Sequence, residues 1–367
     1  MACSSPAPEP ARVWHAGVVN VDTADDVVLN VELITLTNDQ SEFGPISLQV
    51  AVAGPDDGPL ILCVHGWPET WHSWRFQMEH FAAQGFRVAA MNVRGYPGSS
   101  TPADIAAYRL SELAGDTAAV IAHIGGGAPA ILFGHDWGAP IVWQTARLHP
   151  DSVRAVAGLS VPYRPTTPGD PMQLWEALYA DRFFYMKYFQ EPGVAEAAFG
   201  ADIDTALRKV YYAGSADGWQ SWFAHHPADH AFLDGLVDPD PAPKWMAPDA
   251  LAPTLEEFAG HPLHGLFNRY RAQGLDAEEL PGMAPDKLAQ PVCFIGGAED
   301  IVRKFVPGVD VFQHAGNDCD DFRGLTIIEG SGHWVQQEKP HETNVALDAF
   351  VSSFPNPGLP TPGNAAQ

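Results

Sequence analysis

The feature that most constrains the fold of this chain is an alternation of short apolar runs with stretches of helix length. Runs of this kind are typical of strands buried on both faces of a parallel sheet. The alternation predicts a doubly wound, mostly parallel α/β sheet, preceded by leading strands in residues 13–52, with antiparallel pairing as one option. The apolar runs are Leu60–Val64, Arg87–Val93, Ala130–Phe133, Val153–Leu159, Val292–Ile295 and Leu325–Ile328, and helix-length stretches are Thr70–Gln84, Ser111–Ile124 and Ala139–Leu148.

A change of pattern divides the chain into parts. From about residue 161 to residue 285 the strand-like runs disappear, and aromatic-rich helical stretches broken by Pro and Gly take over. Such an insertion would lie over the carboxyl ends of the strands, where open α/β sheets bind ligands. We therefore predict a core of residues 13–160 and 286–354 with a helical cap at 161–285. The ends, 1–12 and 355–367, are rich in Pro, Gly and Ala, and we expect them to be disordered.

The charge balance excludes several kinds of partner. The chain has 45 Asp and Glu against 20 Lys and Arg, a formal net charge of −25, and such a surface repels nucleic acid and anionic lipid. No stretch is apolar over the roughly 18 residues that span a bilayer, and the first residues lack the pattern of a secretory signal. We expect a cytoplasmic monomer or homodimer that binds neither nucleic acid nor membrane.

The cysteines give no sign of a disulfide or a metal site. No two of them form a CxxC pair, and two lie inside apolar runs, where a thiol usually behaves as a small buried hydrophobe. We expect no disulfide and no bound metal, as is usual in a reducing compartment. The four are Cys3, Cys63, Cys293 and Cys319.

The pentapeptide GHDWG at 134–138 follows an apolar run and precedes a helix-like stretch. This is the context of a nucleophile elbow, in which the central side chain stands exposed above the sheet. The same residues also fit an ordinary turn with an aspartate that caps the next helix. A carboxylate is ionised at neutral pH and suits displacement at saturated carbon, which leaves an ester on the enzyme. Asp136 is therefore a candidate nucleophile, and its ester would need a base that activates water.

Two later loops offer that base and its partner. His333 lies in GSGHW, directly after the last apolar run. Asp300 follows the preceding run and could accept the Nδ1–H of His333, which would fix the tautomer of the ring. The neighbouring Glu299 is an alternative acid. The chain order of nucleophile, acid and histidine is the order that α/β hydrolases use.

The tetrapeptide HGWP at 65–68 follows the first apolar run and offers an oxyanion hole. The backbone N–H groups of Trp67 and of Trp137, just after the candidate nucleophile, could both donate to a developing oxyanion. Pro68 would hold the turn rigid, with a cis bond as one option. The alternative is an ordinary turn at the end of a strand.

Five motifs, in this order, carry a resemblance to a known family. They are HGWPETWHSWR, NVRGYPGSS, GHDWGAP, YFQEPGVAE and GSGHWVQQEKP. Together they resemble the α/β-hydrolase-fold epoxide hydrolases, and more narrowly the soluble mammalian hydrolase domain and its bacterial relatives. The likeness extends from about residue 59 to residue 354. It implies an α/β-hydrolase fold with a helical cap, and the conversion of epoxides to vicinal diols with water and without a cofactor.

The resemblance also implies a role for each candidate residue. Asp136 would be the nucleophile that forms a hydroxyalkyl ester, His333 the base that activates water, and Asp300 its orienting acid. Trp67 and Trp137 would be the oxyanion donors.

In the resembling family two cap tyrosines bind and protonate the epoxide oxygen. Tyr185 and Tyr270 match them, and Tyr188 is the alternative to the first. The partners would be a small apolar epoxide and water. We further expect the substrate to contact His65, Pro68, Phe189 and Trp334.

Two other functions fit parts of this pattern. A haloalkane or haloacid dehalogenase shares the carboxylate nucleophile and the ester, and Trp137 is compatible with halide binding. The two cap tyrosines and HGWP favour the epoxide hydrolase. A non-catalytic relative that only binds a ligand would usually have lost a member of the triad or the oxyanion turn, and this chain has lost none.

Overall fold

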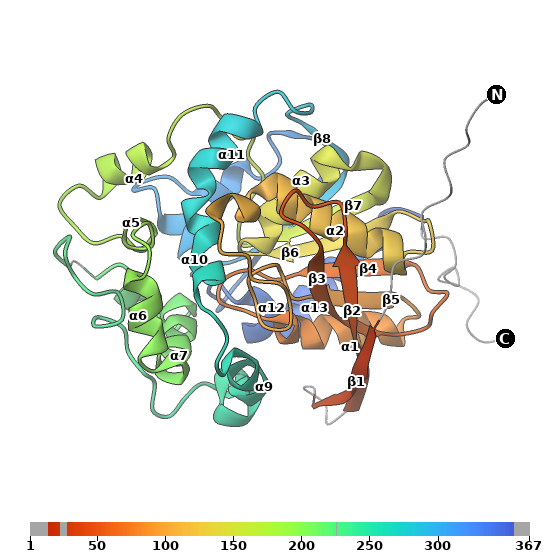
Figure 1. Cartoon of the computed structure of the whole chain (residues 1–367), viewed down its shortest axis with the longest axis horizontal. Helices are drawn as coiled ribbons and strands as arrows, with labels where there is room; N and C mark the ends of the chain where they lie inside the picture. The colour runs from red at the N-terminus through yellow and green to blue at the C-terminus, as the bar shows by residue number, and fades with distance from the viewer. Residues whose placement is uncertain (1–13, 23–27, 225, 356–367) are drawn as a thin grey trace.

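A computed structural model describes residues 14–22, 28–224 and 226–355. The core of the structure is a nine-stranded sheet with the order β1-β2-β3-β5-β4-β6-β7-β8-β9 (Figure 1). Each of the six apolar runs of the sequence forms a strand of this sheet, although the run Arg87–Val93 extends two residues beyond its strand. The strands are β1 (Trp14–Asp22), β2 (Val28–Asn38), β3 (Ile46–Ala53), β4 (Leu60–Val64), β5 (Arg87–Met91), β6 (Ala130–His135), β7 (Val153–Leu159), β8 (Leu288–Gly297) and β9 (Cys319–Ile328).

The pairing of the strands confirms the predicted doubly wound α/β class. Strands β1, β2 and β3 pair antiparallel, and β3 pairs antiparallel with β5. From β5 across to β9 every pair is parallel. Strands β6, β8 and β9 are longer than the apolar runs indicated, and the largest extension at one end is in β9, which begins at Cys319 instead of Leu325. Its first half, CDDFRG, is polar and only half-buried at the sheet edge, so it lacks the apolar signature of a central strand.

Strand β4 shows why the central runs are apolar throughout. Leu60, Leu62 and Val64 pack into one hydrophobic cluster, and Ile61 and Cys63 pack into another on the opposite face. Side chains alternate along a strand, so a strand that is covered on both faces needs an apolar residue at every position. The helices that cover the sheet are α2 (Leu110–Ile124) and α3 (Gly138–Leu148) on one face, and α1 (Arg75–Ala83) and α13 (Pro340–Val351) on the other.

Between β7 and β8 the described residues, 160–224 and 226–287, form helices and loops and no strand. We call residues 160–287 the inserted segment; it lies beside the core in Figure 1. Its helices are α4 (Met172–Leu178), α5 (Tyr185–Tyr188), α6 (Val194–Gly200), α7 (Ile203–Gly214), α8 (Trp219–Trp222), α9 (Pro248–Phe258), α10 (His264–Arg271) and α11 (Gln273–Glu279). A last short helix, α12 (Val335–Glu338), follows β9.

The division into a core and a cap domain at 161–285 stays a prediction. The expected disordered ends, 1–12 and 355–367, lie outside the described residues, apart from Pro355. In the part of the chain that the structure describes, no helix has the length and apolar character needed to cross a bilayer.

The topology decides where a site can form. Strand β4 lies between β5 and β6, and the connection from β4 to β5 through α1 and the connection from β5 to β6 through α2 cover opposite faces of the sheet. Open α/β sheets bind ligands at such a switch point, outside the carboxyl ends of the strands. The loops after β4, β6, β8 and β9 all leave from this edge, because these strands are parallel.

The contact between β7 and α3 gives a test of the packing. A Cβ on Gly158 would lie 1.9 Å from the ring of the buried Trp143, so we expect Gly158→Ala to lower the free energy of unfolding by about 1–3 kcal/mol. In α2, a Cβ on Gly115 meets no atom within 4 Å. Gly115→Ala should therefore stabilise the protein by about 0.5–1 kcal/mol, because glycine is a poor helix former. Urea unfolding measures the free energy of unfolding of both variants. A Gly158→Ala protein as stable as the wild type would contradict the close packing of β7 against Trp143.

Candidate active site

The turn between β6 and α3 holds Asp136 in an unusual backbone conformation. Its φ is 49°, in the left-handed region that non-glycine residues rarely adopt. The flanking glycines allow the chain to pass through this turn. A Cβ on Gly134 would lie 2.4 Å from the Gly138 carbonyl oxygen, and one on Gly138 would lie 2.0 Å from that of Val64. GHDWG is therefore a sharp strand-to-helix turn with Asp136 at its apex, as a nucleophile elbow requires.

The carboxylate of Asp136 is held by two donors. The backbone N–H of Trp67 donates to its Oδ1 over 2.7 Å, and Nε2 of His333 lies 3.3 Å from its Oδ2. Burial alone would raise the pKa of the Asp136 carboxyl, but the hydrogen bond and charge of His333 and the Trp67 N–H outweigh burial. The pKa therefore lies below its ordinary value. Asp136 is ionised at neutral pH.

His333 lies between two carboxylates. Its Nδ1 is 3.0 Å from Oδ1 of Asp300, which is fully buried. Burial lowers the pKa of His333, but the charge of Asp300 and the hydrogen bond to Asp136 raise it to about 10. Glu299, the alternative acid, instead binds the Nζ of Lys304 at 3.2 Å, with both side chains partly exposed. The structure thus places Asp300 against His333.

A second carboxylate–imidazole pair, which sequence reasoning did not assign, lies beneath the site. Oε2 of the buried Glu69 is 2.7 Å from Nδ1 of His135 and accepts the Gly66 N–H at 3.1 Å. The other ring nitrogen of His135 lies 2.7 Å from the His333 carbonyl oxygen. Burial raises the pKa of Glu69, but His135 lowers it more, so the carboxyl stays ionised. The pair links the HGWP turn, the elbow and the His333 loop.

Glu338, also unassigned from the sequence, holds the His333 loop from the other side. Its carboxylate accepts the N–H of Gly332 at 3.0 Å and that of Trp334 at 3.2 Å, the residues on either side of His333. Burial raises the pKa of Glu338 to about 7. Glu69 follows HGWP and Glu338 closes HWVQQE, so both were visible as motif residues. Their partners were not, because Glu69 meets His135 across 66 positions, and the short-range contacts of Glu338 depend on how the His333 loop folds back on it.

Two tyrosines of the inserted segment enter the same site. Tyr185 begins α5 and Tyr270 lies in α10; both are buried, with ring centroids 5.9 Å apart. Burial, and with it the charge of Asp136, raises the pKa of both phenols well above the ordinary value, so both stay protonated. The alternative, Tyr188, packs against Phe183 and Phe232 instead. A small cavity of about 10 Å³ is lined by Trp67, Asp136, Tyr185, Trp222, Tyr270, Ile301, Val302, His333 and Trp334.

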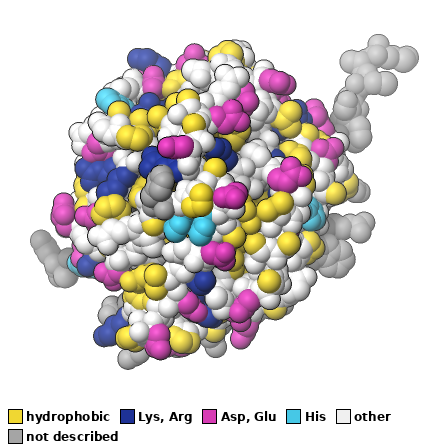
Figure 2. Space-filling model, turned by 90° about the vertical axis from the view of Figure 1, so that its left-hand side faces the viewer, with side chains coloured by type: hydrophobic (Ala, Val, Ile, Leu, Met, Phe, Trp, Pro, Cys, Tyr) yellow, Lys and Arg dark blue, Asp and Glu magenta, His cyan; other side chains and the backbone are white. Residues whose placement is uncertain are grey.

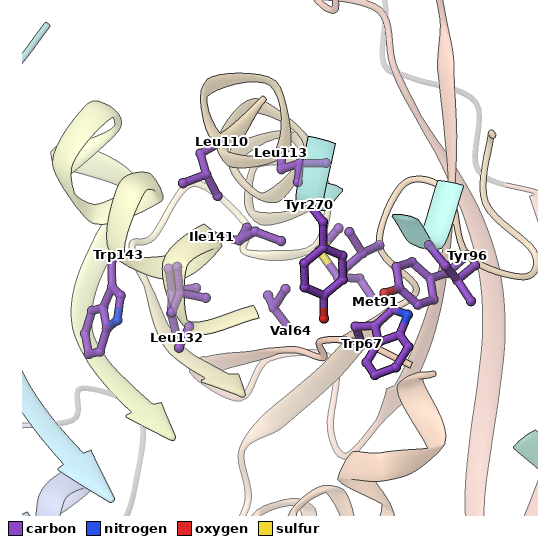
Figure 3. Packing of buried hydrophobic residues seen from close by; sticks show 14 of the residues in the cluster. Val64, Trp67, Met91, Tyr96, Leu110, Leu113, Leu132, Ile141, Trp143 and Tyr270 are labelled. Carbon is purple, nitrogen blue, oxygen red and sulfur yellow. The ribbon is translucent and has the colours of Figure 1, made fainter. Parts of the chain in front are cut away.

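The helix that carries Tyr270 is fixed to the core by its neighbours. Arg269 forms an ion pair with Asp276, and its guanidinium lies over the Trp137 ring, 4.8 Å from the centroid. Asp276 also accepts the N–H of Leu110 at 2.7 Å, at the start of α2. Figure 3 shows Tyr270 beside the indole of Trp67, with the phenol oxygen at the end of the ring nearer that indole. The charged contacts of Arg269 and Asp276 with the core therefore hold the phenol of Tyr270 against the turn that carries Asp136.

Comparisons with known proteins identify the family of the chain. A family model described as the alpha/beta hydrolase fold matches residues 59–232. Epoxide hydrolase A of Mycobacterium tuberculosis is 34% identical over 311 residues, which is 84% of this chain and 95% of that protein. The chain belongs to the epoxide hydrolase family of α/β-hydrolase fold. Epoxide hydrolase 1 of Siraitia grosvenorii is 31% identical over 84% of this chain and 96% of its own length.

Solved epoxide hydrolase structures share the whole architecture. The crystal structure of epoxide hydrolase A from Mycobacterium thermoresistibile superposes with a TM-score of 0.79 at 34% identity, and covers 88% of this chain and 99% of that one. Potato epoxide hydrolase I gives a TM-score of 0.74 at 29% identity, over 87% and 99% of the two chains. The predicted fold and family are thereby confirmed.

Within this epoxide hydrolase fold, the expected substrate contacts divide into two groups. Trp334 lines the small cavity, whereas His65, Pro68 and Phe189 line neither cavity that Asp136 reaches. The ring of His65 is held by the Gly66 carbonyl and the Val93 N–H, and burial lowers its pKa to about 4. Phe189 packs behind Trp67, with centroids 5.1 Å apart. His65 and Phe189 are close to the site motifs in sequence, but in the structure their side chains pack behind the site and do not line either cavity.

A larger cavity of about 440 Å³ also reaches Asp136. Its walls are mainly aliphatic and aromatic, as is common in small-molecule sites. It is lined by Asp136, Trp137, Pro140, Val161, Pro162, Arg164, Leu174, Trp175, Tyr185, Met186, Gln273, Val302, Phe305, Val306, Val309 and Val311.

No group of three or more His, Cys, Asp or Glu side chains in the described ranges could hold a metal ion. Cys63, Cys293 and Cys319 are free thiols, and Cys3 lies outside the described residues.

The coupling between His333 and Asp136 predicts a measurable pH effect. Asp136→Asn removes the facing negative charge, so the pKa of His333 should fall from near 10. NMR titration of ¹⁵N-labelled histidine should then find imidazolium at pH 8 in the wild type, and loss of that proton at lower pH in the variant. Glu299→Gln is the control and should leave the titration unchanged, because Glu299 binds Lys304 instead. Equal His333 titrations in the wild type and Asp136→Asn would show that the two side chains are not coupled.

Proposed function

We propose that this chain converts epoxides to vicinal diols with water, through a covalent hydroxyalkyl ester on Asp136. One observation carries the proposal: an ionised carboxylate and two protonated phenols line the same small cavity, with an imidazole beside the carboxylate. A nucleophile, two acids and a base are the groups that a two-step opening of an epoxide requires. The established family and the names of its members support the same reaction.

In the first step Asp136 attacks a ring carbon and the C–O bond of the epoxide breaks. Negative charge grows on the ring oxygen, where Tyr185 and Tyr270 donate hydrogen bonds, and one phenol transfers its proton to the alkoxide. Their raised pKa keeps both hydroxyls protonated before the reaction. The product of this step is a neutral ester between Asp136 and the hydroxyalkyl group.

The second step depends on a change in His333. The charge of Asp136 contributes to its high pKa, and that charge disappears when the ester forms. The pKa of His333 then falls, and the ring gives its proton to the phenolate left by the first step, which lines the same small cavity. Neutral Nε2 then removes a proton from water. The hydroxide oxygen attacks the ester carbonyl of Asp136 while Asp300 stabilises the imidazolium.

The tetrahedral intermediate collapses to the diol and a free Asp136 carboxylate. The Trp67 N–H, already 2.7 Å from Oδ1 of Asp136, is aimed at the developing oxyanion, and such a donor is worth about 3–4 kcal/mol in related reactions. Trp137 as the second donor is part of this proposal. The small cavity, about 10 Å³, has room for roughly one water molecule beside His333.

The larger cavity supports an apolar substrate, since few polar groups line it. Epoxide and water are then the partners of the site.

A cytoplasmic location and a monomeric or homodimeric state stay predictions, as does the expectation that the protein binds neither nucleic acid nor membranes.

Isotope labelling tests the ester. In a single turnover in H₂¹⁸O, the label should enter Asp136 and be nearly absent from the first diol, because water attacks the ester carbonyl. Mass spectrometry of the peptide that contains Asp136 measures it. His333→Gln should accumulate the ester, for lack of a base. Label that goes straight into the first diol would mean that water attacks the epoxide directly.

The phenols are tested by removing their hydroxyls. Tyr185→Phe and Tyr270→Phe should each lower kcat, and the double variant should lose roughly 10²–10⁴-fold, the usual contribution of general acids. Tyr188→Phe is the matched control, since its ring packs away from the cavity, and should keep wild-type kcat. Diol formation from styrene oxide is the assay, and halide release from a haloalkane is measured beside it. Halide release without diol formation would favour a dehalogenase.

A further inference from the structure

The larger cavity has two unlike ends. At its inner end lies the carboxylate of Asp136, whose side chain is 13% exposed. Two lining residues, Leu174 and Val309, are instead among the most exposed large apolar side chains of the described residues, at 51% and 41%. These two mark the mouth of the cavity. A solvent-exposed apolar rim favours a ligand that has a long apolar body.

Among the described residues that line this cavity, one is a cation. Arg164 follows β7, is exposed to solvent and contributes to the same wall. Among the arginines of residues 14–22, 28–224 and 226–355, it stands alone in having no hydrogen bond, ion pair or ring contact. Each of the others has such a partner.

The isolation of Arg164 is unusual for this chain. Acidic side chains outnumber basic ones by 45 to 20, and Figure 2 shows Asp and Glu spread over the side of the molecule that carries α4 to α7. A surface arginine in such a protein readily finds a carboxylate, yet this one faces an apolar cavity. Its charge acts locally, because screening limits the reach of an exposed charge to about 8 Å at physiological salt.

We propose that Arg164 determines substrate specificity by binding a carboxylate at the far end of an apolar epoxide. This inference rests on the proposed epoxide hydrolase activity. The epoxide ring lies at Asp136, the hydrocarbon chain lies along the apolar wall, and the carboxylate meets the guanidinium at the mouth. Asp136 enforces this orientation, because its negative charge repels the carboxylate from the inner end.

The test is a series of ω-epoxyalkanoates of increasing chain length, each paired with its neutral carboxamide. Diol formation gives KM and kcat for every pair. Within a window of chain lengths, KM of the carboxylate should be about two- to fivefold lower than that of the amide, the range for an exposed ion pair, with kcat unchanged. Shorter chains cannot reach from Asp136 to Arg164 and should show no preference. High salt should reduce the preference within the window.

Variants separate a charge effect from a structural one. Arg164→Gln should remove the preference for the carboxylate while the amides keep their KM. Arg164→Glu should reverse it, so that an epoxide with a trimethylammonium tail becomes the better substrate. Arg323→Gln is the matched control, because Arg323 is exposed and bound to Asp321 and does not line the cavity; its kinetics should match the wild type.

Three results would decide against the inference. Equal KM values for acids and amides at every chain length would overturn it and leave the proposed function intact. So would a preference that survives Arg164→Gln. Absence of diol from every epoxide, acids and amides alike, would overturn the proposed function and this inference with it.

Discussion

The ion pair between Asp136 and His333 is the interaction on which the site depends. A buried carboxylate is costly unless charged or hydrogen-bonding partners compensate for the lost water. The Trp67 N–H and the His333 ring provide this compensation, and Asp300 stabilises the positive charge on the ring. In the proposed mechanism this pair also orders the two steps, because loss of the Asp136 charge on esterification would lower the pKa of His333 and let it act as a base.

Around this pair the protein builds a rigid frame of further charges. Glu69 and His135 join the loops after β4, β6 and β9, and Glu338 fixes the backbone on either side of His333. The inserted segment is held to the core by charged groups as well: Asp276 accepts the Leu110 N–H, and Arg269 lies over the Trp137 ring. Catalysis benefits from donors and acids that are in position before the reaction, since they need no reorganisation as charge develops. The larger cavity, in contrast, is lined mainly by apolar side chains.

Much of the fold and part of the site could be predicted from local patterns. Central strands were visible because burial on both faces requires an apolar residue at every position. The polar first half of β9 was missed because an edge strand escapes that requirement. The pattern favoured Asp300 and left Glu299 as an alternative; the two are adjacent in sequence, but Asp300 faces the core and Glu299 the surface. Likewise, His65 and Phe189 stand beside site motifs, yet their side chains pack behind the cavity.

The sequence by itself determined the order of strands and helices along the chain, the glycine-flanked turn at Asp136 and the residue types available for catalysis. These are local properties, set by side-chain size, polarity and backbone freedom over a few neighbouring positions. Only the tertiary structure decided which groups meet: Trp67 with Asp136 across 69 positions, and His135 with the His333 backbone across 198. Such contacts arise because parallel strands bring their carboxyl ends to one edge, and burial and charge then select which side chain of each loop turns inward.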